Sequence, residues 1–261
     1  MKKIILLFPI FLLTVFIAYF LTHPLGSFPQ KIISTPTPFN PYPYHSPIIP
    51  NKHAYLTLLV GDSMVAALGP SANSLRLELL KLYPTHEFVN YNRAVPATNV
   101  LTLTSVINEN LDDGFDLVII GSFAYNPLSH LPLDQGLKAQ TKALDTTIKT
   151  LIQKRPEVVI VMITPIAPNK YTFAQKTYAL APEVRAAWVT ERIAYINNHI
   201  KFAKDHQIPL VNIYETSLNE NGDGNPIYIS SDDYIHPSNA GIELMSREIA
   251  QFIFDNQIFP N

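Results

Sequence analysis

The chain has 261 residues, of which 47% are hydrophobic and 15% are charged, so it can bury a large apolar core and wholesale disorder is excluded. The formal net charge is -2, with 19 basic and 21 acidic residues, and this balance argues against a nucleic-acid partner. Cysteine is absent, which excludes disulfides, thiolate metal sites and a cysteine nucleophile.

The first element in chain order is an uncharged apolar run. Residues 4–21 read IILLFPIFLLTVFIAYFL and follow Lys2 and Lys3. A helix of this length spans about 27 Å, close to the hydrocarbon core of a bilayer. We therefore expect residues 1–23 to be a single-pass membrane helix, with the lysines in the cytoplasm and the rest of the chain outside the cell membrane. A cleaved signal peptide is the alternative, although no small-x-small cleavage site follows the run.

Residues 24–52 have a different composition. Of the 22 prolines in the chain, 8 lie between Pro24 and Pro50. Proline fixes φ and has no N–H, so we expect an extended, semi-rigid linker that does not pack. Docking of a proline-reading partner on this segment is the alternative.

From residue 53 to residue 261, β-rich runs alternate with stretches of helical spacing. The predicted strands are 54–60, 87–92, 116–122, 157–165 and 208–214, and the predicted helices are 71–82, 99–111, 134–153, 182–205 and 239–254. Several strands are apolar throughout, which is typical of strands covered by helices on both faces. We expect one domain with an α/β fold, a mainly parallel five-stranded sheet in a three-layer α/β/α sandwich. Ligands bind beyond the carboxyl ends of the strands in such sheets.

Two short motifs could carry chemistry. Gly61-Asp62-Ser63 follows the first predicted strand, and a serine that opens a helix exposes its hydroxyl beside backbone N–H groups. A serine nucleophile needs a base, and the base needs an orienting carboxylate. Near the C-terminus, Asp233 precedes His236 by three residues. On a turn, such a carboxylate accepts a hydrogen bond from Nδ1 and leaves Nε2 free to take a proton.

The order and placement of these motifs resemble the SGNH (GDSL-type) hydrolase superfamily. The resemblance covers about residues 54–256, and two of the four family sequence blocks match well. It implies a flavodoxin-like α/β/α fold in which Ser63 is the nucleophile, His236 the general base and Asp233 the orienting partner of that base. It implies no metal and no organic cofactor.

The two middle blocks depart from the family pattern. Ala97 stands where the family has a glycine, and the resemblance implies that the backbone N–H groups of Ser63 and Ala97 face the oxyanion. The third block is normally Gly-x-Asn-Asp, but Phe123 stands at the asparagine position after Gly121, and Asn126 lies three residues further on. We expect the Asn126 amide to return towards Ser63 as a third oxyanion donor. The Phe123 ring is expected to pack beneath the loop.

Other side chains are interpreted more simply. His199 and His206 lie on or just after a predicted helix and are expected at the surface. Trp188 and the tyrosines of 170–180 are expected to be ordinary core or surface aromatics, with a mobile lid as the alternative. The segment 219–224, NENGDG, begins like a calcium loop but lacks the glutamate that ends one, so we expect a turn.

The sequence therefore predicts a membrane-anchored, extracytoplasmic serine esterase that uses a Ser-His-Asp triad. We expect a monomer that acts on a small-molecule, polysaccharide or lipid ester. Two alternatives stay open: a cell-envelope O-acyltransferase with the same triad, and a non-catalytic binding module that has lost its oxyanion donors.

Overall fold

The computed structural model describes residues 39–260, so the predicted membrane helix and most of the Pro-rich segment lie outside the described residues. Within the described range, no helix combines the length and the apolar character needed to cross a membrane. The described residues from Asn40 onward form one compact unit.

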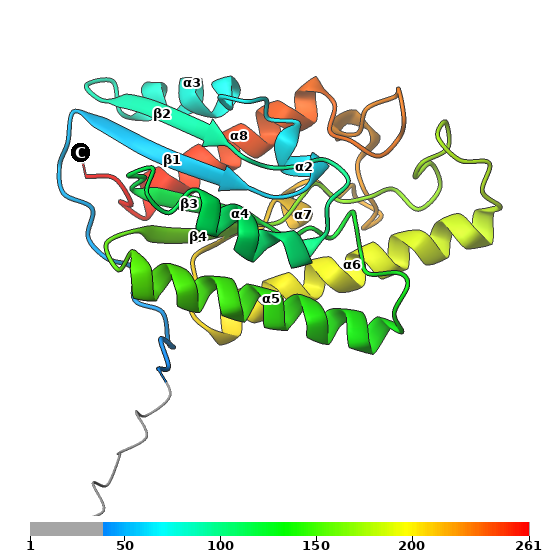
Figure 1. The fold of residues 1–261 in the computed structure, drawn as a ribbon. Coiled ribbons are helices and arrows are strands. Elements are labelled where there is room, and N and C mark those ends of the chain that lie inside the picture. The colour runs from blue at the N-terminus through cyan, green and yellow to red at the C-terminus, as the bar shows by residue number, and fades with distance from the viewer. Residues whose placement is uncertain (1–38, 261) are drawn as a thin grey trace, which may run out of the picture. The chain divides into compact units, whose positions relative to one another are not determined.

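Five parallel strands form the sheet at the centre of this unit (Figure 1). The strands are β1 (Ala54–Val60), β2 (Glu87–Asn92), β3 (Leu117–Gly121), β4 (Val159–Ile163) and β5 (Leu210–Val211). Their order is β2-β1-β3-β4-β5, and every neighbouring pair is parallel. The chain starts in the middle of the sheet and builds first one edge and then the other, so the switch point lies between β1 and β3. The predicted α/β fold with a five-stranded parallel sheet is confirmed.

Helices cover both faces of the sheet. They are α2 (Ser63–Ala66), α3 (Asn73–Leu82), α4 (Leu103–Glu109), α5 (Leu133–Lys154), α6 (Pro182–Asp205), α7 (Ile213–Thr216) and α8 (Asn239–Asp255), with the 3₁₀ turns η1 (Val100–Thr102) and η2 (Pro226–Tyr228). Helix α3 packs beside α8, and α5 packs against both α4 and α6. This arrangement is the three-layer sandwich that the alternating pattern predicted (Figure 1).

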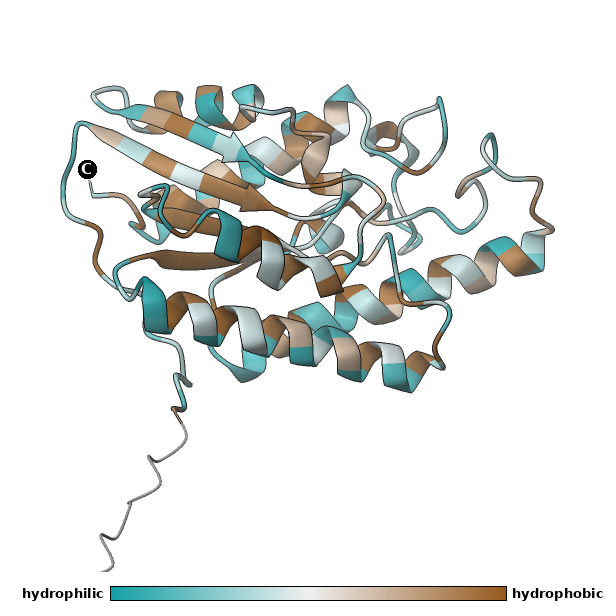
Figure 2. Cartoon of the chain, viewed as in Figure 1, coloured by the Kyte–Doolittle hydropathy of each residue, from teal (hydrophilic) through white to brown (hydrophobic). Residues whose placement is uncertain are grey.

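Side chains of the central strands alternate between two hydrophobic clusters. Leu117 and Ile119 belong to the cluster that contains α3 and α8, whereas Val118 and Ile120 belong to the one beneath α4 and α5. Both faces of β3 and β4 are therefore apolar, as the hydropathy colouring shows (Figure 2). Each such side chain stabilises the fold by roughly 1.5–3 kcal/mol, which accounts for the continuous apolar runs in the sequence.

Some elements are shorter than predicted. Strand β5 has two residues rather than the seven of 208–214, because the chain turns into α7 at Ile213. There the Thr164 hydroxyl accepts a hydrogen bond from the Tyr214 N–H at 2.8 Å. The predicted helix 99–111 is divided into η1 and α4. Helix α6 begins and ends at the predicted residues.

The described end of the Pro-rich segment packs onto the domain. The Tyr44 hydroxyl accepts from the Ile160 N–H at 2.9 Å, and the Tyr44 N–H donates to the His206 carbonyl at 2.9 Å. Ile49 is buried in the first hydrophobic cluster. The expectation of an unpacked linker is therefore wrong for this part, because burial of its aromatic and aliphatic side chains, such as Tyr44 and Ile49, stabilises the packed form.

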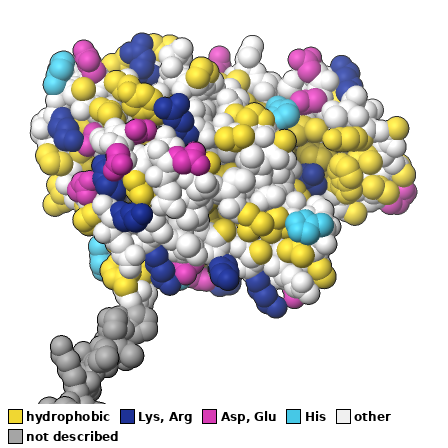
Figure 3. Space-filling model, viewed as in Figure 1, with side chains coloured by type: hydrophobic (Ala, Val, Ile, Leu, Met, Phe, Trp, Pro, Cys, Tyr) yellow, Lys and Arg dark blue, Asp and Glu magenta, His cyan; other side chains and the backbone are white. Residues whose placement is uncertain are grey.

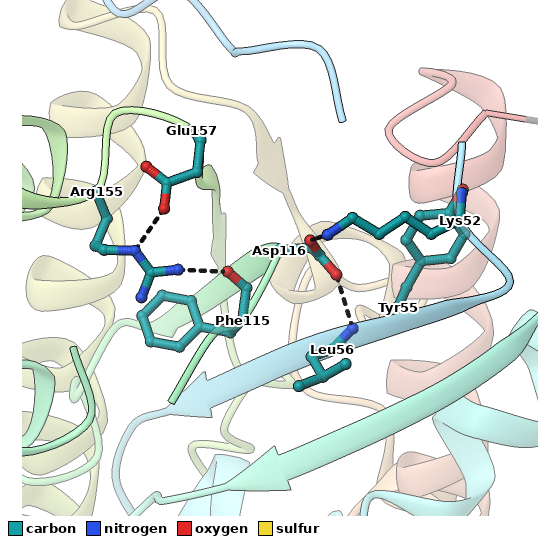
Figure 4. A network of polar contacts seen from close by, with 7 residues as sticks. All are labelled: Lys52, Tyr55, Leu56, Phe115, Asp116, Arg155 and Glu157. Atoms are coloured by element: carbon teal, nitrogen blue, oxygen red, sulfur yellow. Dashed lines mark hydrogen bonds and ion pairs between the residues drawn. The ribbon is translucent and has the colours of Figure 1, made fainter. Parts of the chain in front are cut away.

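Polar contacts tie together the amino ends of β1, β3 and β4 (Figure 4). Lys52 forms an ion pair with Asp116, whose second oxygen accepts from the Leu56 N–H at 3.1 Å. Arg155 donates to the Phe115 carbonyl at 3.2 Å, and its guanidinium lies 4.8 Å from the centre of the Phe115 ring. The opposite, carboxyl end of the sheet is left for the loops that carry the predicted motifs.

The sequence predicts His199 and His206 at the surface, but neither side chain is fully exposed. His199 is fully buried, and burial lowers its pKa from 6.5 to about 3. His206 is partly buried and stacks on Tyr42, with ring centres 3.8 Å apart. The reason is that α6 contacts both clusters, through Ile196 and Phe202, so that the side of the helix carrying His199 is turned inward.

Two glycines let the ends of β1 and β3 approach α2 closely. A Cβ at Gly121 would lie 2.6 Å from Val65 Cγ2, and a Cβ at Gly61 would lie 2.4 Å from the same atom and 2.8 Å from Val65 Cβ. Both distances are far below an ordinary contact, so neither position accepts a side chain without movement of α2.

Gly121→Ala is expected to destabilise the protein by about 1–3 kcal/mol through overpacking. Val65→Ala removes the one side-chain atom that clashes at Gly121, so the double variant should be more stable than the sum of the single effects. Gly61→Ala is the matched control, because Val65 Cβ remains in the way. Urea unfolding of wild type, the three single variants and the two double variants that combine each glycine change with Val65→Ala measures this, and equal coupling for both glycines contradicts the packing argument.

Stability is expected to fall with acid because of His199. Its folded pKa is depressed, so unfolding takes up a proton below the unfolded pKa of 6.5. The free energy of unfolding should drop by about 2 kcal/mol between pH 7.5 and pH 5 from this group alone. His199→Leu should flatten that slope, whereas His130→Leu, which changes an exposed histidine, should keep it. An unchanged slope in His199→Leu shows that other groups cause the acid sensitivity.

Candidate active site

The serine of the first motif lies at the start of α2, directly after β1. The Asp62 carboxylate caps this helix by accepting from the Met64 N–H at 3.1 Å. The Asn92 amide, at the end of β2, donates to the carbonyls of Val65 and Gly69 at 2.8 and 3.0 Å. The turn that carries Ser63 is therefore held both by its own cap and by the neighbouring strand.

The second motif forms a turn that presents an imidazole–carboxylate pair. His236 Nδ1 lies 2.5 Å from Asp233 Oδ2. The other oxygen of Asp233 accepts from the backbone N–H groups of Ile235 and His236 at 2.8 and 3.0 Å. Burial tends to raise the pKa of Asp233, but the hydrogen bonds from the imidazole and from these N–H groups outweigh it and hold the pKa below its usual value. The carboxylate thus stays ionised and bonds to Nδ1. This bond fixes the orientation of the imidazole ring and leaves Nε2 outside the pair.

The loop after β3 brings Asn126 beside the turn that carries Ser63. Its amide Nδ2 donates to Asp62 Oδ2 at 3.3 Å. Phe123 and Ser122 are buried, with 2% and 3% exposure, and Phe123 packs in the second hydrophobic cluster as expected. Asp62 is also buried, which raises its pKa to about 6 against the hydrogen bonds from Met64, Asn126 and the Tyr125 backbone. One Asn126 N–H is engaged by Asp62, and the amide carries a second.

Ala97 adopts the left-handed conformation, with φ of 58°. Glycine adopts such an angle freely, whereas alanine does so at a cost in free energy. The position therefore has the backbone geometry expected of the glycine it replaces. The backbone N–H groups of Ala97 and Ser63 donate no hydrogen bond to any other residue in the part of the chain that the structure describes.

The predicted site residues meet in one cavity of about 420 Å³. All five of them line it: Ser63, Ala97, Asn126, Asp233 and His236. Within residues 39–260, no direct hydrogen bond joins the Ser63 hydroxyl to the His236 ring. Such bonds are often long in unliganded enzymes and shorten when substrate binds.

Sequence reasoning missed one whole wall of this cavity. Phe173, Thr177 and Tyr178, from the segment between β4 and α6, line it together with Trp188 and Arg192 of α6. These aromatics are therefore not the scattered residues expected. Their segment, 164–181, contains no helix or strand and follows the carboxyl end of a central strand. Loops of that length inside a compact domain are commonly functional, and this signal was present in the sequence.

The wall is tied down at several points. Arg185 donates to the carbonyls of Phe173 and Tyr171 at 3.0 Å each. The Ala174 N–H donates to the Tyr234 carbonyl, in the turn that carries the imidazole, at 3.1 Å. Hydrophobic side chains gather on the surface at the end of the molecule where α6 begins (Figure 3). The wall of the cavity is thus largely aromatic, with Arg192 and Thr177 as its polar side chains.

The segment 219–224 forms a turn, closed by a bridge between Leu218 and Gly224. Asp223 Oδ1 accepts from the Lys170 N–H at 3.0 Å and so holds the start of the cavity wall. Within the described range, no cluster of three or more acidic or histidine side chains is arranged to hold a metal ion.

Comparisons with known proteins bear on the fold. No protein-family profile and no curated protein sequence matches this chain. Solved structures do match. The lipase/acylhydrolase from Enterococcus faecalis is 18% identical with a TM-score of 0.57, over 77% of this chain and 96% of that one. A GDSL-like lipase from Bacteroides thetaiotaomicron is 14% identical with a TM-score of 0.55, over 77% of this chain and 88% of that one.

Both similarities cover 77% of this chain and most of the other chain. Their low identity makes them a statement about fold. They agree with the resemblance that the Gly-Asp-Ser and Asp-x-x-His motifs suggested. The described part of the chain therefore has the SGNH (GDSL-type) hydrolase fold.

Proposed function

We propose that this protein is a serine esterase that hydrolyses a carboxylic ester, with Ser63 as nucleophile, His236 as general base and Asp233 as the residue that orients the base. One observation carries the proposal: Ser63 shares a cavity with an imidazole whose Nδ1 is held 2.5 Å from a carboxylate. A His–Asp pair that only stabilises a loop is not expected to share a substrate-sized cavity with a serine at the start of a helix.

In the proposed reaction the Ser63 oxygen attacks the ester carbonyl while His236 Nε2 takes the hydroxyl proton. Asp233 accepts from Nδ1 and stabilises the imidazolium that forms. The imidazolium then gives its proton to the leaving alcohol, and an acyl group remains on Ser63. Water attacks the acyl-enzyme with the same base, which releases the acid and restores the serine.

The negative charge of the tetrahedral intermediate needs hydrogen-bond donors. We assign the backbone N–H groups of Ser63 and Ala97 and the side-chain amide of Asn126 to this role. The first two have no other partner within the described residues, and the third is positioned by its hydrogen bond to Asp62. Donors held in place before the reaction cost no reorganisation when the charge develops. This assignment of three donors supports a catalytic site over the binding-module alternative.

A fluorophosphonate probe is expected to label Ser63, and peptide mapping locates the adduct. Ser63→Ala and His236→Ala should each lower the hydrolysis of short-chain aryl esters by roughly 10⁴–10⁶-fold, and the double variant should lose little more because the residues act as a unit. Ser231→Ala, a change of an exposed serine near the same turn, is the control and should label normally. Wild-type protein that neither labels nor hydrolyses any ester would favour the non-catalytic alternative.

Asn126→Ala should lower kcat by about 10²–10³-fold with little change in KM, as the loss of one oxyanion donor does. His130→Ala, an exposed residue in the same loop, should leave both constants unchanged. Steady-state kinetics on one aryl ester separates these effects. A rise in KM at constant kcat shows instead that Asn126 binds the ground state, and an unchanged kcat removes it from the oxyanion assignment.

A further inference from the structure

The cavity contains one cation that the proposed reaction does not use. Arg192 lines the cavity from α6, and its side chain is only 12% exposed. Its guanidinium carbon lies 4.8 Å from the centre of the Phe173 ring and 5.3 Å from that of Trp188. Both aromatic rings therefore lie against the guanidinium, whose N–H donors point outward in its plane, so a hydrogen-bonding ligand binds at the edge of the group.

The hydrogen bonds of Arg192 are incomplete. One Nη donates to the Trp188 carbonyl at 2.9 Å, and the buried Nε has no partner among the described residues. Glu191 Oε2 lies 3.9 Å from the same Nη and already accepts from the Ser129 hydroxyl at 2.9 Å. Burial lowers the pKa of Arg192, against the charge of Glu191. A largely buried cation without a hydrogen-bonded counterion costs free energy, which a folded protein rarely tolerates without a use.

A second arginine on the same helix shows what a structural role looks like. Arg185 donates to three backbone carbonyls, those of Phe173, Tyr171 and Leu180, at 3.0, 3.0 and 3.2 Å. The N–H groups of Arg185 therefore hold the cavity wall in place. The N–H groups of Arg192 are not used in this way, although both side chains lie against that wall.

We propose that the ester substrate carries an anionic oxygen group, a carboxylate or a phosphate, and that Arg192 binds this group in the cavity that holds Ser63 and His236. The inference rests on the proposed esterase function and names its substrate class. Apart from Arg192, the acid–base pair on the cavity is Asp233 and His236, which bond to each other, so Arg192 is the cation that an incoming anion meets there; its nearest carboxylate, that of Glu191, lies 3.9 Å from it. The planar fork of arginine suits paired oxygens better than an ammonium does.

Three acetyl esters with nearly the same ring test this. They are methyl 4-acetoxybenzoate, which is neutral, 4-acetoxybenzoate, which carries a carboxylate, and 4-acetoxyphenyl phosphate. Wild-type protein should prefer one or both anionic esters, and the preferred one identifies the group. Arg192→Gln should lower kcat/KM for that ester by about 10–100-fold, as loss of a charged hydrogen bond does, with less than about threefold change for the neutral ester.

Arg192→Lys should retain part of the preference, because it keeps the charge and loses the fork. Arg247→Gln is the matched control, since it removes the same charge from an exposed position of α8 that does not line the cavity. Equal losses on the neutral and anionic esters in Arg192→Gln would assign the residue a structural role and overturn the inference. So would a wild-type enzyme that hydrolyses the neutral ester at least as well as the anionic ones.

A binding measurement makes the outcome independent of turnover. Trp188 is the only tryptophan in the chain and contacts Arg192, so its fluorescence should change and saturate as benzoate or inorganic phosphate is added. The change should vanish in Arg192→Gln. If anions bind in this way but no ester is hydrolysed, the anion site stands and the esterase proposal fails. If neutral esters are hydrolysed while neither anion alters the fluorescence, the anion site fails and the esterase proposal stands.

Discussion

The candidate site depends on one close contact. The ends of β1 and β3 approach the short helix α2, which lies between these strand ends and the cavity. Only glycine fits at Gly61 and Gly121, because Val65 occupies the space that a Cβ would need. This packing brings the turn that carries Ser63 against the loop that carries Asn126, from strands that are neighbours in space. Since β1 and β3 flank the switch point of the sheet, the crevice opens where the two halves of the fold diverge.

The loops that reach this crevice share a second property, backbone strain. Ala97, Phe123 and Tyr234 all have positive φ, at 58°, 56° and 58°, and none of them is glycine. The left-handed conformation costs roughly 1–2 kcal/mol at each such residue. The three residues lie in the loops that hold Ala97, Asn126 and the Asp233–His236 pair. Strain of this kind persists only where surrounding contacts fix the chain, and it aims N–H groups and side chains that a relaxed loop would not present.

Charge is arranged differently at the two ends of the sheet. At the amino end, Asp116 is paired with Lys52 and Arg155 is bound by carbonyls, so the charges there serve the fold. At the carboxyl end, Asp233 bonds to the His236 ring, Asp62 is buried with a pKa raised to about 6, and the nearest carboxylate to Arg192, that of Glu191, lies 3.9 Å away without a hydrogen bond. Groups whose protonation is displaced by their surroundings gather at functional sites more often than elsewhere, and here Asp233 and Arg192 line one cavity while Asp62 bonds to Asn126 beside it.

The sequence by itself determined the features that depend on local pattern. Continuous apolar runs placed the strands, helical spacing placed α6 at its observed ends, and the two motifs placed Ser63 and the Asp233–His236 pair. Only the tertiary structure decided which residues line the rest of the cavity. The cavity wall of 164–181 is held by distant contacts, such as the one from Lys170 to Asp223, and has no period of its own. His199 is buried because α6 touches two clusters at once. A local sequence pattern indicates which helix or strand a segment can form. The burial of a residue and its neighbours in space follow from contacts between segments far apart in the chain.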